Sequence, residues 1–306
     1  MKKLSLYIYL FILMNGAFAA DLGDGIFKKV DPVLVAIQHE RASGSGFIIS
    51  EDGYILTNGH VVSLMDRENP KATAKRITVI LHDEKKYQAD VVGFSLDPDV
   101  ALLKITTEKK LAVAELSDSE KVKPGQTCYA FGAPLGLKKT LTKGIISNNA
   151  QTSLGTYTKV FQMDAVINPG NSGGPLFNEE GKVIAMNTYG GKAGIGFSIP
   201  INVATLMAEH FKKHGRFIRT ELSFFLAKIM NEDFAKTLKA PKGLFVDYVM
   251  PNTPMAKLGL QAEDIIAEFD GKKVNINNDR EFMDFSWALS TRSVGSKVSM
   301  KVYRRK

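Results

Sequence analysis

Short apolar runs bounded by turn residues make up the chain between Val33 and Ile199. Clusters of glycine, asparagine and aspartate separate many of these runs. Many short strands at such spacing are typical of β-barrels and β-sandwiches. The pattern therefore predicts an all-β unit and leaves the choice between the two architectures open. The runs expected as strands cover residues 46–50, 54–57, 77–81, 87–93, 125–131, 143–148, 159–164 and 182–188.

The period of the pattern changes after Pro200. Val203, Met207 and Phe211 recur at helical spacing, and Gly215 follows the last of them. Apolar residues three and four positions apart share one face of a helix, and glycine commonly ends one. We therefore expect a helix over residues 201–214 that closes the all-β unit.

A second unit is expected from residue 219 to the end of the sequence. Its patterns predict helices at 231–239 and 279–289, and strands at 243–249, 264–269 and 297–303. Asp270-Gly271 is a typical hairpin turn between strands. The mixture of elements indicates a small α+β unit.

The first residues have the pattern of an export signal. Lys2 and Lys3 precede an apolar stretch over 4–14, and Ala17-Phe18-Ala19 follows it. Such a segment is typical of a secretory signal peptide, here residues 1–19 with cleavage after Ala19. An uncleaved membrane anchor is the alternative, although the apolar stretch is short for a span of roughly 20 residues. The expected location is the periplasm or the secreted space.

Charge and cysteine content exclude several classes of function. The formal net charge is +8, and removal of the leader takes away two lysines and no acidic residue, which leaves +6. The basic residues are scattered and form no stripe with interleaved aromatics, so nucleic-acid binding is not expected. Cys128 is the single cysteine, which excludes an intrachain disulfide. We see no metal-ligand spacing among the histidines and expect no metal site.

The stretch from Asn168 to Leu176 (NPGNSGGPL) places Ser172 on a very glycine-rich turn. A serine nucleophile in acyl transfer needs preorganised N–H donors close to the attacked atom, because an oxyanion forms there. We assign the N–H groups of Gly170 and Ser172 to this oxyanion hole. An ordinary glycine-rich turn between strands is the alternative for this stretch alone.

Two upstream segments supply the partners that a serine nucleophile requires. His60 follows the strand 54–57 through the turn Asn58-Gly59, and Asp99 stands at the start of an apolar strand. The histidine would act as general base and then acid, and the aspartate would orient it. The chain order histidine, aspartate, serine is that of the chymotrypsin-type double barrel.

Five motifs resemble those of the HtrA (DegP/DegS-like) serine proteases. The resemblance implies a mainly β fold, with a chymotrypsin-like double β-barrel over residues 33–215. It also implies endopeptidase activity on misfolded or signal-bearing proteins, no cofactor and a homotrimeric core. Asp99 directly precedes the apolar strand as the family's acid does, which favours it over Asp97. The motifs are 44–49 (GSGFII), 57–62 (TNGHVV), 100–103 (VALL), 170–176 (GNSGGPL) and 194–200 (GIGFSIP).

The second unit, residues 219–306, resembles an HtrA-type PDZ domain. The motifs are 243–246 (GLFV), 254–260 (PMAKLGL) and 264–266 (DII). PDZ domains bind a peptide C-terminus through backbone N–H groups and an added strand. The resemblance implies Leu222, Ser223 and Phe224 as peptide-binding residues. Ser223 stands where the family usually has glycine, so a domain that serves only for packing and regulation is the alternative.

Apolar residues surround the expected substrate pocket. Ile167 precedes the nucleophile turn, Ile195 lies in the last protease motif, and no aspartate stands where a trypsin would bind arginine. We therefore expect cleavage after small or medium aliphatic residues.

Residues 20–32 are left as an N-terminal segment. Two further functions remain open: a chaperone or PDZ-based stress sensor with little proteolysis, and a signalling protease of narrow specificity.

Overall fold

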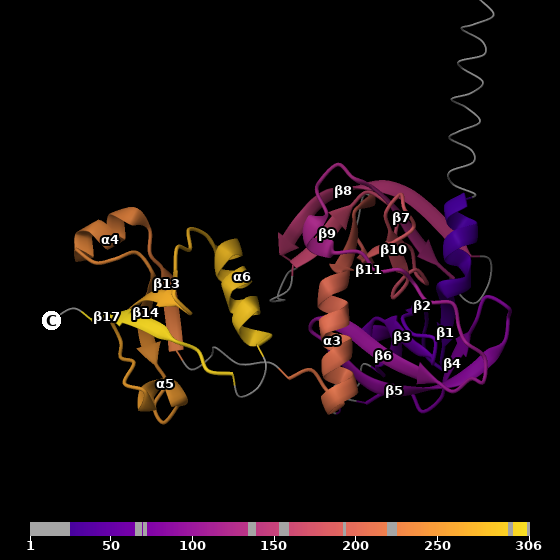
Figure 1. Cartoon of the computed structure of the whole chain (residues 1–306), viewed down its shortest axis with the longest axis horizontal. Coiled ribbons are helices and arrows are strands. Elements are labelled where there is room, and N and C mark those ends of the chain that lie inside the picture. Colours follow the sequence, from indigo (N-terminus) through magenta and orange to yellow (C-terminus); the bar gives the residue numbers. More distant parts are fainter. Residues whose placement is uncertain are drawn as a thin grey trace, which may run out of the picture. The chain divides into compact units, whose positions relative to one another are not determined.

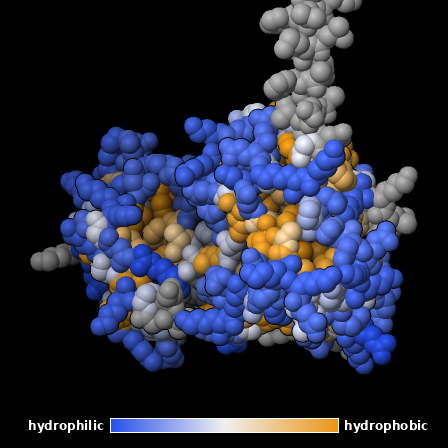
Figure 2. Space-filling model, turned by 45° about the vertical axis from the view of Figure 1, so that its right-hand side comes forward, coloured by the Kyte–Doolittle hydropathy of each residue, from blue (hydrophilic) through white to orange (hydrophobic). Residues whose placement is uncertain are grey.

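The computed structural model describes residues 25–64, 69, 72–133, 139–152, 159–191, 194–218, 225–292 and 296–304. The chain divides into two compact units, Met1–Phe217 and Ile218–Lys306. The expected leader lies outside the described residues. Within the described part, no helix has the length and apolar character needed to cross a membrane. The space-filling view shows a mainly hydrophilic surface on which apolar residues gather in patches (Figure 2).

The first half of the N-terminal unit is a closed antiparallel β-barrel (Figure 1). Its interior is filled by aliphatic side chains, with Ile37, Ile55 and Leu103 fully buried. Strands β3 and β6 pair along their length, and this pairing brings the residues at the end of β3 to the start of β6. The strand order is β1 (Leu34–Gln38), β2 (Ser43–Ile48), β3 (Tyr54–Thr57), β6 (Asp99–Ile105), β5 (Lys86–Leu96) and β4 (Ile77–Ile80).

The second half repeats this architecture. The short 3-10 helix η2 (Ser119–Lys121) lies in the connection between the barrels, and β10 pairs with β7 to close the second one. The predicted double β-barrel is confirmed. The order is β10 (Pro175–Phe177), β11 (Val183–Gly190), β12 (Gly196–Pro200), β9 (Lys159–Met163), β8 (Thr140–Thr152) and β7 (Thr127–Gly132).

Helix α3 (Ile201–His214) joins the two barrels, since it contacts β5 and β6 of the first and β11 and β12 of the second. Ala204, Met207 and Phe211 are buried on its inner face. Gly215 ends the helix at φ 67°, in the left-handed region that glycine adopts readily. The predicted helix is confirmed over its full length.

Residues 25–30 form a helix that the sequence pattern did not predict, and η1 (Asp31–Val33) follows it. Ile26 and Val30 are buried in the core, and the ring of Phe27 meets Phe131 of β7 edge-on at 5.0 Å. This part of the N-terminal segment is therefore packed against the barrels.

The C-terminal unit is the expected α+β domain. Strands β14 and β15 lie inside the sheet, and Leu244, Val246 and Ile266 form its core. The predicted helices and strands are present, with ends that differ by up to three residues. The elements are β13 (Phe225–Ile229), α4 (Glu232–Leu238), β14 (Leu244–Val249), α5 (Pro254–Lys257), β15 (Ile265–Phe269), β16 (Lys272–Lys273), α6 (Asp279–Ser290) and β17 (Met300–Tyr303).

A buried carboxylate joins the chain just before β15 to the chain just after β17. Asp264 has no exposed surface and accepts hydrogen bonds from Arg304 Nε and Nη2, both at 2.7 Å, and from the Gln261 N–H at 2.8 Å. Burial by itself would raise the pKa of Asp264, but the hydrogen bonds from Arg304 and Gln261 outweigh it and hold this pKa below its usual value.

Candidate active site

His60 lies in a short helical turn that follows β3 of the first barrel. Strand β3 ends at Thr57, and the chain then turns into the single helical turn α2 (Gly59–Val62). A Cβ on Gly59 would collide with the Ser95 carbonyl oxygen, so only glycine lets the chain pass here. The side chain of Asn58 donates to the Asp99 carbonyl at 2.9 Å and ties this turn to β6.

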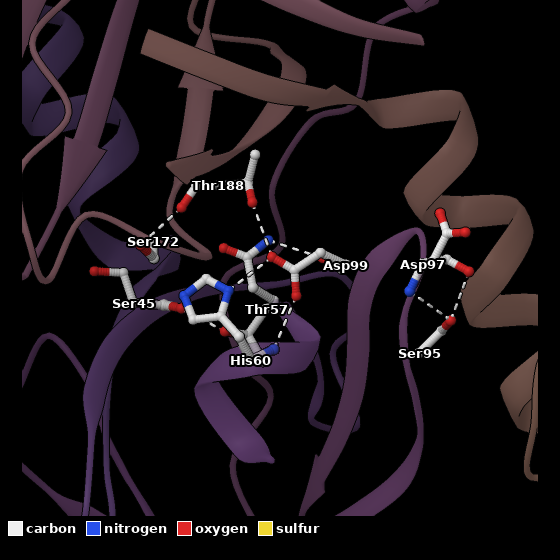
Figure 3. A network of polar contacts seen from close by, with 9 residues as sticks. Ser45, Thr57, His60, Ser95, Asp97, Asp99, Ser172 and Thr188 are labelled. Atoms are coloured by element: carbon white, nitrogen blue, oxygen red, sulfur yellow. Dashed lines mark hydrogen bonds and ion pairs between the residues drawn. The ribbon is translucent and has the colours of Figure 1, made fainter. Parts of the chain in front are cut away.

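Asp99 holds His60 through both oxygens of its carboxylate (Figure 3). Oδ2 lies 2.7 Å from His60 Nδ1, and Oδ1 accepts the backbone N–H of His60 at 2.8 Å. Oδ2 also accepts the hydroxyl of Thr188 at 2.8 Å. The two side chains are partly open to solvent, with 38% of His60 and 20% of Asp99 exposed. The carboxylate thus fixes the orientation of the ring.

Asp97 lies apart from this contact, beside Ser95 (Figure 3). Its backbone N–H donates to the Ser95 hydroxyl at 3.2 Å, and its carbonyl accepts that hydroxyl at 2.9 Å. Of the two acidic residues in this turn, the structure brings only Asp99 into hydrogen-bonding contact with His60.

Ser172 lies on the turn that leads into β10 of the second barrel. Its hydroxyl donates to the backbone carbonyl of Thr188 at 2.8 Å (Figure 3). Thr188 therefore contacts Ser172 through its carbonyl and Asp99 through its side chain. The serine hydroxyl is directed to Thr188 instead of His60 in this conformation.

Gly170 and Ser172 carry the two N–H groups expected to form the oxyanion hole. Gly170 has φ 101°, a conformation that side-chain-bearing residues rarely adopt. Neither N–H donates a hydrogen bond within the described part of the chain, whereas Asn171, between them, donates to the Asn168 carbonyl at 3.0 Å.

The expected pocket residues come from two adjoining segments. Ile167 is half-buried. Its carbonyl oxygen lies against Gly190 and its side chain against Gly196, so closely that a Cβ on either glycine would collide with Ile167. Ile195 is 38% exposed, and its carbonyl accepts the Gly191 N–H at 2.5 Å. The exposed aliphatic surface continues over Val166, which is 45% exposed. The expected peptide-binding residues of the second unit, Leu222, Ser223 and Phe224, lie outside the described residues.

Two contacts of this site were not predicted from the sequence. Thr188 lies in β11 without any local motif, and its position becomes evident only when both barrels are assembled. Ser45 is fully buried behind the nucleophile turn and donates to the Gly170 carbonyl at 2.6 Å. It lies in the motif 44–49, but that motif gave no sign of this contact.

The described part of the chain offers neither a reactive thiolate nor a metal-binding cluster. Burial, together with the charge of Asp164, raises the pKa of the Cys128 thiol to about 12, so the thiol stays protonated. Within the described ranges, no group of three histidine, cysteine or acidic side chains is close enough to hold a metal ion.

Two closed barrels that bring a histidine, an aspartate and a glycine-flanked serine together define the trypsin-like class of serine proteases. The family models agree, since a trypsin-like peptidase domain matches residues 44–186 and a PDZ domain matches residues 222–306.

Comparison with individual proteins narrows the class. The solved structure described as HtrA-type protease AlgW with tripeptide has a TM-score of 0.77 and 33% identity, with 91% of each chain covered. The serine endoprotease from Yersinia pestis has a TM-score of 0.69 and 28% identity, with 92% of each chain covered. The chain belongs to the HtrA-type serine proteases, and a PDZ domain follows its protease domain.

Curated relatives extend beyond the region that this chain matches. The probable periplasmic serine endoprotease DegP-like of Pseudomonas putida (strain W619) is 40% identical over 276 residues, which is 87% of this chain and 54% of the relative. Periplasmic serine endoprotease DegP of Salmonella typhimurium is 37% identical over 277 residues, which is 87% of this chain and 55% of the relative. The chain thus spans about half the length of these relatives.

Proposed function

We propose that this chain is a serine endopeptidase that hydrolyses peptide bonds through an acyl-enzyme formed on Ser172. The observation that carries the proposal is the continuous set of contacts from His60 through Asp99 and Thr188 to Ser172. This arrangement supplies a base, an orienting acid and a nucleophile within one set of hydrogen-bonded residues.

The first requirement is a histidine in the correct tautomer. Ionised Asp99 has no hydrogen to donate, so the short contact at 2.7 Å assigns the hydrogen to His60 Nδ1. Nε2 then keeps its lone pair and serves as the general base.

The second requirement is a reachable nucleophile. Rotation about the Cα–Cβ bond of Ser172 would transfer its hydroxyl from the Thr188 carbonyl to His60 Nε2. Nε2 removes the proton as Oγ attacks the substrate carbonyl, and the negative charge that forms on the substrate oxygen is stabilised by the N–H groups of Gly170 and Ser172.

The reaction is completed in two further steps. Protonated His60 gives its proton to the leaving amine, the scissile C–N bond breaks and the acyl-enzyme remains. Water, deprotonated by His60, then attacks the ester, and Ser172 recovers its proton as the new carboxylic acid leaves.

We infer that the substrates are unfolded or C-terminally exposed polypeptides in the periplasm. Ile167 packs against Gly190 and Gly196, and Ile195 is 38% exposed. If these aliphatic side chains line the pocket, they favour small or medium aliphatic residues before the scissile bond. The names of the relatives and the leader pattern support a periplasmic location after signal-peptide cleavage. The homotrimer is proposed by family resemblance.

We also propose that the PDZ domain regulates the protease. In this conformation the Ser172 hydroxyl is turned to Thr188, so activity requires a change at the site. Related HtrA-type structures are described with a tripeptide or a decapeptide. A hydrophobic peptide C-terminus bound at Leu222, Ser223 and Phe224 is the proposed signal.

The test compares the protein beginning at Ala20 with its Ser172→Ala variant on unfolded casein, with and without hydrophobic C-terminal peptides. Cleavage by the first protein alone supports the proposal, and faster cleavage with peptide supports regulation. No cleavage, with both proteins preventing aggregation of a client equally, would favour the chaperone or sensor. Cleavage of one partner but not of casein would favour the narrow-specificity protease.

A further inference from the structure

Ser45 of β2 is a first-barrel residue that is hydrogen-bonded to the nucleophile turn through both its backbone and its side chain. It has no exposed surface. Its N–H donates to the Ser172 carbonyl at 2.8 Å, and its carbonyl accepts the Thr57 hydroxyl at 2.7 Å. Its hydroxyl accepts the Ala133 N–H at 2.8 Å and donates to the Gly170 carbonyl at 2.6 Å. All the hydrogen-bonding groups of Ser45 are therefore engaged.

The contact with Gly170 fixes a part of the turn that has little other restraint. Gly170 has no side chain to limit its backbone rotation, and it already lies at φ 101°. Its carbonyl is held by Ser45, while its own N–H is one of the two proposed oxyanion donors. An oxyanion hole works only when its donors are held in place before the charge develops.

We propose that the Ser45 hydroxyl is a positioning group for the oxyanion hole. This inference rests on the proposed protease function. The hydroxyl links the Gly170 carbonyl to the backbone at the end of β7, so the conformation of Gly170 depends on a buried contact between the barrels. Without the hydroxyl, Gly170 gains other conformations in which its N–H is directed away from the substrate oxygen.

Removal of this hydroxyl leaves the nucleophile in place. The contact with the Ser172 carbonyl comes from the Ser45 backbone, which every substitution except proline retains. Ser45→Ala should therefore affect the step in which charge develops more than substrate binding. Loss of an interaction made only in the transition state lowers kcat without changing KM.

A buried serine that merely stabilises the fold provides the matched control. Ser119 is 3% exposed, and its hydroxyl accepts the Asn202 N–H at 3.2 Å, between η2 and α3. Ser119→Ala removes a buried hydroxyl on another part of the same unit. Both variants should lose stability, but only Ser45→Ala should lose turnover.

The experiment measures kcat and KM per folded molecule on a fluorogenic aliphatic peptide for the mature protein and both variants, with Ser172→Ala as the blank. We expect Ser45→Ala to lower kcat by about 10-fold to 100-fold, less than the roughly 100-fold to 1,000-fold for complete loss of one donor. KM should stay within about twofold. Affinity for a peptide trifluoromethyl ketone, whose adduct places an oxyanion in the hole, should fall in parallel with kcat.

The inference is overturned if Ser45→Ala loses stability as Ser119→Ala does while its kcat stays unchanged. If Ser45→Ala does not fold, Ser45→Cys replaces it under the same criteria, because a thiol fills the site but is a weak donor. Inactivity of the mature protein itself, with and without peptide, would instead reject the proposed protease function and this inference with it.

Discussion

Thr188 and Asp99 are joined by a hydrogen bond of 2.8 Å from the threonine hydroxyl to the carboxylate that orients His60. The carbonyl of the same threonine accepts the Ser172 hydroxyl, also at 2.8 Å. One residue of β11 therefore contacts both the proposed acid and the proposed nucleophile. This relationship connects the two barrels at the site.

Thr188→Val removes the donor to Asp99 and keeps the shape of the side chain and the backbone carbonyl. A hydrogen bond to a charged group contributes about 1.5–3 kcal/mol, so we expect kcat/KM to fall roughly 10-fold to 100-fold. Steady-state cleavage of an aliphatic peptide measures the effect. Thr188→Ser, which keeps the hydroxyl, should restore most of the rate. Equal rates for all three proteins would show that this contact has no part in turnover.

Asp99→Asn should reduce kcat by about 10⁴-fold, because an amide in place of the carboxylate favours the wrong imidazole tautomer. Asp97→Asn should leave kcat nearly unchanged, since Asp97 lies beside Ser95 and does not contact His60. The two variants are compared on the same peptide and casein substrates. A large loss of kcat in Asp97→Asn with little loss in Asp99→Asn would identify Asp97 as the orienting acid.

Arg304→Met should destabilise the C-terminal unit in a pH-dependent way. The pKa of Asp264 in the folded state lies below its usual value of 3.8. The ionised carboxylate therefore stabilises the fold fully above pH 3.8, and this stabilisation is lost as the pH falls through the lower folded-state pKa. Without Arg304, burial raises the pKa of Asp264 and this contribution is lost. The difference between the wild-type and variant urea midpoints should therefore be large at pH 7 and smaller near pH 3.

Fluorescence of Trp287 reports this unfolding, because the single tryptophan of the chain lies on α6 in the C-terminal unit. Lys301→Met is the matched control, since it breaks only the exposed pair of Lys301 with Glu268 at 3.1 Å. Exposed pairs contribute little, so its midpoint should stay near that of the wild type at both pH values. If the difference in urea midpoint between the wild type and Arg304→Met does not change with pH, the loss of stability comes from packing alone.

The sequence predicted those features that depend on local patterns. Helix α3 follows a clear apolar period and ends at a glycine, and the turns that carry His60 and Ser172 have their own motifs. The helix at residues 25–30 is too short for its period to be distinctive, and its stability comes from packing against Phe131. Thr188 and Ser45 could not be found in this way, because their roles arise from contacts between distant strands.

Ile167→Ala should widen the substrate preference toward larger residues before the scissile bond. Ile167 fills space between Gly190 and Gly196, and its truncation removes aliphatic volume from that position. A methylene in a hydrophobic pocket changes discrimination by about 1–3 kcal/mol, so we expect kcat/KM for phenylalanine relative to valine to rise at least about 10-fold. Mass spectrometry of casein fragments and matched peptide substrates measures the preference. Dominant cleavage after lysine or arginine by the wild type would contradict the predicted aliphatic preference. An unchanged profile for Ile167→Ala would show that Ile167 does not line the pocket.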